Sequence, residues 1–526
     1  MACQARIVVD AEGSPPLVHT LSLRPFGSNH VIVRSLVRHV NSKMRLEPAT
    51  EPANRKSKTP TTMAALEAGK RRSATVALWI TYINIVLYAL CYQLQRPVEP
   101  FLVAKLTTSA DGDDASDATT DDAAIMYGRV QSFFSAIQTV GSPLVGILLD
   151  RIGIRRTSAL VFAASALSYA ILAHATDLTT LFLSKIPTVL QHAFLVAQAT
   201  AATEAGSDDA VRAQALGRMT TSYTIGATIG PALGGYLAHG DGDDSKVGDM
   251  YFGAWLAVFG SIISVVLSLL YLPDEHYHTG TSSGASTKSK AQQQSNSFLA
   301  DVKKTVNIAA RSHIWPLLAV KVIGGVARSM HSTALPLALK EGLDFDPAQL
   351  GMVMSSASLA VAAFGAFALK PSTNALGSEG LARLGLAFRG VMAISIAHIV
   401  SSYSLSESLS SKSPVFIRIC TASVAHALAS HALATSLTTM TTGAVPASER
   451  GAILGLEHGL FSFVGVFAPT AGTALLARGG GFLTVALVNA AIDAILVGAL
   501  YTWAQTRRSF VGGKSGSQTD KDEHSD

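Results

Sequence analysis

The residues of this sequence that could do chemistry are ionisable side chains placed inside long apolar runs. A charge in hydrocarbon is expensive, so such a side chain normally faces a polar cavity or a partner of opposite charge. Lys321 and Arg328 lie seven residues apart in one run, which is two helical turns, so they share a helical face. Lys185 and His192 have the same spacing in another run. The pattern predicts a polar interior with basic groups and histidines.

Other apolar runs supply further candidates for this interior. The polar and ionisable candidates are Arg418, His426, Glu457, Asn84, Tyr88 and Gln138. Arg328 lies too near the middle of its run to reach water, whereas Lys185, Lys321 and Arg418 lie close enough to an end to snorkel. Glu457, His192 and His426 are the groups that could carry a proton, although His192 could equally be an ordinary hydrogen-bonded interior histidine. Arg96 and Glu99 are expected at the outer mouth of the cavity.

No enzyme chemistry is indicated by the sequence. It has no metal-ligand spacing, no nucleophile elbow and no nucleotide fingerprint, so we expect no catalysis, no metal and no cofactor. Without a phosphate-binding loop, transport driven by ATP is not expected either. The three cysteines do not form a disulfide framework.

Twelve apolar runs must position these side chains. The chain has 526 residues, of which 48% are hydrophobic and 15% are charged. Soluble domains carry roughly 25% charged residues, so several soluble domains or a nucleic-acid-binding chain are excluded. A helix needs about 20 apolar residues to cross a bilayer. We therefore predict an all-α membrane protein with twelve transmembrane helices, over residues 74–94, 125–148, 157–175, 179–203, 212–238, 251–272, 314–338, 349–369, 381–403, 414–441, 450–477 and 481–505.

Polar segments divide these helices six and six. Residues 1–73 carry twelve Lys or Arg against five Asp or Glu, which predicts a basic disordered tail. An organelle transit peptide, or a true start at Met44 or Met63, are the alternatives for this segment. The remaining divisions are an N-terminal half over 74–272, a linker over 273–313, a C-terminal half over 314–505 and a tail over 506–526.

The charges of the loops orient the array. Basic residues cluster before the first helix, after the second, in the linker and after the twelfth, which all fall on one side. Aspartates at 111–122 and 241–249 fall on the other. Since basic loops stay in the cytosol, both termini and the linker are expected there. A plasma membrane and an internal membrane fit equally well.

The two halves repeat each other in sequence. At a fixed offset of 238 residues Arg212 matches Arg450, Gly217 matches Gly455, Pro231 matches Pro469 and Gly234 matches Gly472. Two six-helix halves with a cleft between them are typical of alternating access.

A loop motif links the chain to a known family. Residues 146–156, GILLDRIGIRR, resemble the signature between the second and third helices of the major facilitator superfamily. The resemblance implies a loop that latches the two halves together in the outward-facing state. Its residues here are Gly146, Asp150, Arg151, Gly153, Arg155 and Arg156. The corresponding loop of the second half, residues 370–383, retains almost nothing of this signature.

A second motif lies in the fifth helix. Residues 226–235, GATIGPALGG, resemble the signature of proton-coupled antiporters, with Gly226, Gly230, Pro231, Gly234 and Gly235 as its residues. An ordinary kinked packing helix is the alternative, because proline bends a helix and glycines allow close packing.

Segments around Lys185, His192 and Gly217 are similar to the organic-cation-transporter-like branch of solute carriers. The superfamily resemblance implies that helices one, four, seven and ten line the cavity. Arg389 and Asp493 then lie on peripheral helices, where a buried pair or snorkelling is expected.

We therefore expect a monomeric secondary transporter of a small organic solute, working in a lipid bilayer and binding no nucleic acid. The resemblance favours proton-coupled antiport of organic cations or drugs. The excess of cationic candidates instead favours a uniporter or symporter of an organic anion or metabolite. A membrane receptor or scaffold that does not transport is the alternative of another class.

Overall fold

The computed structural model describes residues 60–110, 120–204, 209–238, 249–273, 305, 307–312, 314–405, 412–446 and 449–519. The chain divides into two units, Met1–Leu66 and Glu67–Asp526. Apart from the first residues of α2, everything described below belongs to the second unit. Most of the predicted tail and linker lies outside the described residues. Every regular element in the described ranges is a helix.

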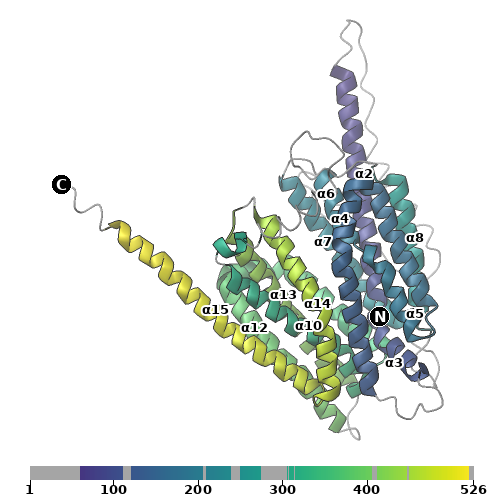
Figure 1. The fold of residues 1–526 in the computed structure, drawn as a ribbon, viewed down its shortest axis with the longest axis vertical. Helices are drawn as coiled ribbons and strands as arrows, with labels where there is room; N and C mark the ends of the chain where they lie inside the picture. The colour runs from purple at the N-terminus through teal and green to yellow at the C-terminus, as the bar shows by residue number, and fades with distance from the viewer. Residues whose placement is uncertain are drawn as a thin grey trace, which may run out of the picture. The chain divides into compact units, whose positions relative to one another are not determined.

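The N-terminal half is built from α2 to α8 (Figure 1). Its elements are α2 (Pro60–Leu94), α3 (Glu99–Ala110), α4 (Thr120–Ala173), α5 (Leu178–Lys185), the short 3₁₀ helix η2 (Ile186–Leu190), α6 (Ala193–Glu204), α7 (Asp209–Leu237) and α8 (Phe252–Tyr271). The helix α2 begins before residue 74, and α3 adds a helix that the apolar runs did not predict.

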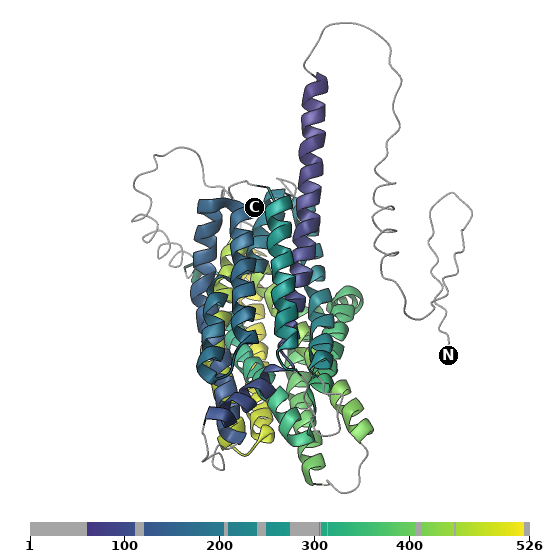
Figure 2. The same ribbon diagram turned by 90° about the vertical axis from the view of Figure 1, so that its right-hand side faces the viewer.

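The C-terminal half repeats this arrangement, and its helices (green to yellow) form a second bundle beside the first, inclined to it in Figure 1 and overlapping it in Figure 2. Its elements are α10 (Trp315–Leu343), α11 (Pro347–Ala363), the π-helical turn η3 (Phe364–Ala368), α12 (Leu369–Leu405), α13 (Lys412–Gly443), α14 (Arg450–Arg478) and α15 (Phe482–Thr519). The last helix continues past the predicted boundary at residue 505.

Two continuous helical stretches, α4 and the run from α11 to α12, each cross the membrane twice. At about 1.5 Å per residue, the 54 residues of α4 would far exceed a hydrocarbon core of about 30 Å. Gly153 (φ 81°) interrupts α4, and Gly377 (φ 68°) interrupts α12. Glycine adopts this conformation without a steric penalty. The loop at 370–383, which keeps almost nothing else of the signature, thus has a turn glycine like that of the first half.

With these turns the fold has the predicted twelve transmembrane helices. Within the described ranges, eight helical stretches are long and apolar enough to span a membrane, and two of these, Asp121–Ala173 and Pro347–Tyr403, contain the glycine turns. The helices α7 and α10 complete the set; they are too polar on average to stand out by composition. We call the side of the bundle with Gly153 and Gly377 the turn end and the other side the opposite end.

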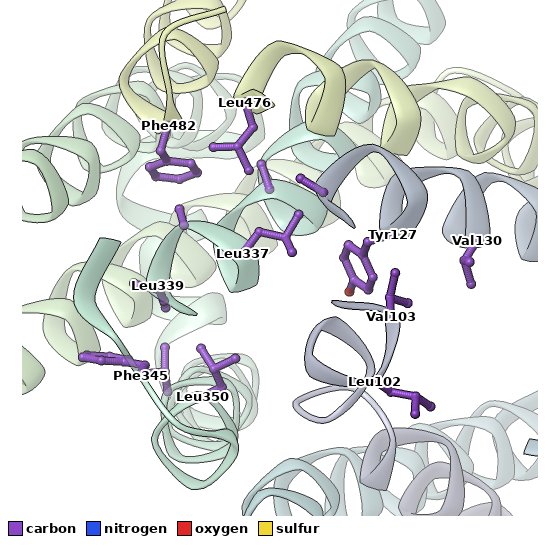
Figure 3. Packing of buried hydrophobic residues seen from close by; sticks show 14 of the residues in the cluster. Leu102, Val103, Tyr127, Val130, Leu337, Leu339, Phe345, Leu350, Leu476 and Phe482 are labelled. Atoms are coloured by element: carbon purple, nitrogen blue, oxygen red, sulfur yellow. The ribbon is translucent and has the colours of Figure 1, made fainter. Parts of the chain in front are cut away.

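The two halves meet through two pseudo-symmetric helix pairs, α4 with α14 and α7 with α11. A hydrophobic cluster near the opposite end joins them (Figure 3). It combines Leu102, Val103 and Tyr127 of the first half with Leu337 and Phe482 of the second. A separate cluster lies within each half, so the first is the apolar contact that holds the halves together.

Matching hydrogen bonds cross this interface beside the two helix prolines. The amide of Ala232, which follows Pro231, donates to Ser355 Oγ at 2.8 Å. The amide of Thr470, which follows Pro469, donates to Ser132 Oγ at 3.3 Å. Ala232 and Thr470 correspond in the repeat. A helix proline disturbs the hydrogen-bond ladder around it, and here the next amide bonds to the other half.

The halves are closed at the opposite end and open at the turn end. A Cβ added to Gly235 would clash with the backbone of Pro347, and one added to Gly351 would clash with Pro231. At the turn end, a Cβ added to Gly146 or Gly455 would meet nothing within 4 Å. Gly146 therefore makes no close contact with a neighbouring helix in this conformation.

Candidate functional site

The fourth crossing is interrupted where it carries Lys185 and His192. The carboxylate of Asp177 caps α5 by accepting the amide of Thr180 at 2.8 Å, and this hydrogen bond lowers the pKa of Asp177. After Lys185 the chain passes through η2, which has Pro187 in its first turn. Broken helices are stable in a membrane only where their free backbone groups find partners.

Two predicted cavity residues provide those partners. Gln138 donates to the carbonyl of Thr188 at 2.7 Å, and the Tyr88 hydroxyl donates to the carbonyl of Gln191 at 3.3 Å. Both therefore hold the break in place. Asn84 lies elsewhere, because it donates to Ser268 of α8 at 3.2 Å. Its position between helices of the first half indicates a packing role.

A polar cavity lies beside the break. Lys185 Nζ forms an ion pair with Glu99 Oε1 at 2.6 Å, and Gln131 donates to the other oxygen at 2.7 Å. Arg96 also lines the cavity. The volume of this cavity is about 40 Å³. A cavity of this size holds a water molecule but not a drug-sized solute. Glu99 is buried in this conformation, in which the opposite end is closed.

A second ion pair is buried in the C-terminal half. Lys321 of α10 bonds to Glu457 of α14, and each side chain is only 5% exposed. Lys321 also donates to Thr438 at 2.7 Å, while Thr441 donates to Glu457 at 2.5 Å. A charge held this way costs less than an unpaired one. Lys321 therefore does not snorkel.

The third ion pair joins the peripheral helices. Arg389 donates to Asp493 through Nε at 2.9 Å and through a second guanidinium nitrogen. It also donates to the carbonyl of Gly324 at 3.2 Å. Of the two expectations for these residues, the buried pair is the one observed.

Arg328 differs from the other basic residues. Its side chain is exposed, and no described carboxylate pairs with it. Its charge lies within interaction range of Arg96 and Arg389. The ionisable residues discussed so far are five basic ones (Arg96, Lys185, Lys321, Arg328 and Arg389) and three acidic ones (Glu99, Glu457 and Asp493). Basic residues therefore outnumber acidic ones by two in this set.

The histidines separate into two environments. His192 lies at the helix break, and its buried Nε2 has no hydrogen-bond partner in the described ranges. His426 stacks on His331 of α10, with ring centroids 3.9 Å apart. His331 was not among the predicted residues, although it follows Arg328 by three positions and shares its helical face. Arg418 is exposed on α13, consistent with snorkelling.

The residues of the loop motif form the turn between the second and third crossings. Arg155 donates to the carbonyl of Leu269, near the end of α8. Asp150, Arg151 and Arg156 are exposed. The loop is therefore tied to its own half in this conformation.

The motif of the fifth crossing forms a packing seam. A Cβ on Gly226 would lie 2.5 Å from the carbonyl oxygen of Val86, and one on Gly230 would lie 2.6 Å from Gln93 Cβ. A Cβ on Gly234 would clash with the backbone of Leu94, which belongs to α2 like Val86 and Gln93. These glycines recur every four residues, so they form one helical face against the first crossing.

Comparison with known proteins agrees with this geometry. The family model of the Major Facilitator Superfamily matches residues 81–409, more than half of the chain. The chain belongs to this family of membrane transporters. The sequence therefore identified both the fold and the family correctly.

Two relatives by sequence and one solved structure show how far the similarity extends. Mouse "Solute carrier family 22 member 18" is 25% identical over 403 residues, covering 75% of this chain and 87% of the relative. The class G tetracycline resistance protein of Vibrio anguillarum is 30% identical over 213 residues, covering 40% and 48%. The crystal structure of the human organic anion transporter MFSD10 (TETRAN) aligns with TM-score 0.56 at 16% identity, covering 81% and 99%. At that identity the structural likeness concerns the fold alone.

Proposed function

We propose that this protein moves a small organic anion, such as a carboxylate, across the membrane by alternating access coupled to protons. The observation that carries the proposal is the charge of Arg328, which lies near the middle of α10 and pairs with no described carboxylate. Glu99, Glu457 and Asp493 each bind a basic partner. An anionic solute is the group that would complete the pairing of charges.

The Lys321–Glu457 pair supports the coupling. A proton added to Glu457 removes its negative charge and weakens its hold on Lys321. The freed ammonium then adds to the positive field that attracts an anion. A proton and an anion bound in this way move together, so the proposal is symport.

A second candidate function is proton-coupled antiport of organic cations or drugs. The likeness to the tetracycline resistance protein and the intact glycine-proline motif favour it. In this case Glu457 would exchange its bond to Lys321 for one to a cationic solute.

The proposed orientation puts the turn end, both termini and the linker in the cytosol, on the basis of loop charge. One chain contains both halves, which supports a monomer as the working unit.

Uptake by purified protein in proteoliposomes tests the substrate class. Arg328→Gln should weaken carboxylate uptake by about tenfold or more in apparent affinity, since a charged hydrogen bond contributes about 1.5–3 kcal/mol. Arg328→Lys should retain part of it. Arg478→Gln, which removes an exposed charge at the opposite end, is the matched control. Uptake of organic cations alone would favour the second candidate, and no flux of any solute would favour a receptor or scaffold.

Coupling is tested by imposing a pH gradient on the same liposomes. Glu457→Gln cannot release a proton, so we expect uptake to continue down a solute gradient but to lose its response to the proton gradient. Glu449→Gln removes a carboxylate that bonds to Arg311 outside the interior and should leave the response intact. An unchanged response in Glu457→Gln would contradict this role.

A further inference from the structure

Two arginines are left over when the ion pairs of the interior have been assigned. The three pairs described above use all three acids of that set, and each pair lies within one half. The basic residues that remain are Arg96 and Arg328, and neither forms an ion pair with a carboxylate in the described ranges. Arg96 belongs to the N-terminal half and Arg328 to the C-terminal half. Each half therefore contributes one arginine that lacks a carboxylate partner.

Arg96 lies in the turn between α2 and α3. Its amide donates to the carbonyl of Gln93 at 3.3 Å, and its side chain lines the small polar cavity beside Glu99. The two oxygens of Glu99 already have partners, Lys185 at 2.6 Å and Gln131 at 2.7 Å. Arg96 is partly exposed, so its guanidinium can still meet a solute.

A run of contacts through α14 brings Arg328 to the same region from the other half. Met330 follows Arg328 by two residues, and a Cβ added to Gly472 of α14 would lie 2.7 Å from the Cα atom of Met330. Two residues before Gly472, the hydroxyl of Thr470 lies 2.8 Å from that of Ser132 on α4. The middle of α10 therefore lies at a depth in the bundle similar to that of Ser132.

The two guanidinium groups act on one region between the halves. Gln131, next to Ser132, lines the cavity of Arg96, and α10 contacts α4 directly. The charges of Arg96 and Arg328 lie within interaction range of each other. Like charges repel strongly where water is scarce, so a negatively charged solute between them is favoured.

We infer that Arg96 and Arg328 bind the two ends of a small dicarboxylate, one end on each half. A guanidinium is a planar fork that matches one carboxylate, so two forks match two carboxylates. The inference rests on the proposed anion transport and names the class of its substrate.

The two arginines differ in their surroundings. Glu99 lies within interaction range of Arg96 and reduces its positive field, whereas the charged groups within range of Arg328 are arginines. A first carboxylate is therefore expected at Arg328, and Arg96 adds the binding of a second.

Calorimetric titration of the purified full-length protein in detergent tests the class of solute. Succinate and butyrate have equally many carbon atoms, but succinate has two carboxylates and butyrate has one. At about pH 7.5 all of these carboxylates are ionised. We expect the wild-type protein to bind succinate about tenfold more tightly, because a second charged hydrogen bond forms. Sulfate, which places both charges on one compact group, should compete weakly.

Variants assign the two ends of the solute. Arg96→Gln should lose the preference for succinate but keep its affinity for butyrate, which also shows that the variant is folded. Arg96→Lys should retain part of the preference. Arg328→Gln should weaken the binding of both solutes, whereas Arg478→Gln, which removes an exposed charge, should change neither.

Three results overturn the inference: wild-type protein that binds both solutes equally or neither, strong competition by sulfate, or an unchanged preference in Arg96→Gln. If the preference persists in Arg96→Gln while Arg328→Gln weakens the binding of both solutes, the proposed anion transport stands and the inference alone fails. If Arg328→Gln changes neither affinity, the proposed function fails as well.

Discussion

Arg389 and Asp493 allow a test of charge pairing at the scale of single residues. Arg389→Ala leaves a buried carboxylate without its partner, and breaking such a pair costs about 3–5 kcal/mol. We expect a lower unfolding temperature in detergent. The double variant Arg389→Met/Asp493→Leu removes both charges and should recover most of the loss. A double variant less stable than Arg389→Ala would show that the pair itself stabilises the fold.

The sequence indicated most of the interior charges but not their partners. The spacing of Lys321 and Arg328 fixes their shared face on one helix. This spacing does not show which neighbouring helix faces the two side chains. Glu457, the partner of Lys321, lies 136 residues further along the chain. The pairing of Glu99 with Lys185 was not predicted, because the apolar pattern of a single segment does not reveal that α3 and α5 come together. His331 was missed although its position after Arg328 was a usable signal.

At the scale of elements, the glycine seam of α7 is the sharpest test. Gly234→Ala would place a methyl group against the backbone of Leu94, and overpacking of this kind costs about 1–3 kcal/mol. Gly217→Ala, in the same helix, meets nothing within 4 Å and is the matched control. We expect thermal unfolding to separate the two variants clearly. Equal stability would mean that the seam is loosely packed.

Most crossings were predictable because each is apolar over about 20 residues, whereas α7 and α10 are less apolar and stand out less clearly. The break after Lys185 was not, because it depends on hydrogen bonds from Gln138 and Tyr88 on other helices. Gly377 shows a similar limit. Gly377 keeps the turn conformation although the charged residues of the signature are absent from the loop at 370–383. The sequence motif alone therefore did not show that both halves turn at this place.

At the scale of the whole molecule, the central claim is that the two halves rock against each other. The contacts between Ser132 and Thr470, whose hydroxyls are 2.8 Å apart, must then separate during each cycle. The likeness of the halves supports this, since Ser355 makes the matching contact to Ala232. A covalent link across this interface should stop the motion without disturbing either half.

Reversible cross-linking measures this most directly. Ser132→Cys/Thr470→Cys, in protein without native cysteines, should form a disulfide between the halves. Ser158→Cys/Ser268→Cys, whose hydroxyls are 2.9 Å apart within one half, is the control. We expect oxidation to abolish uptake by proteoliposomes only in the first variant, and reduction to restore it. Full uptake by completely cross-linked Ser132→Cys/Thr470→Cys would contradict alternating access through separation of the halves at this end.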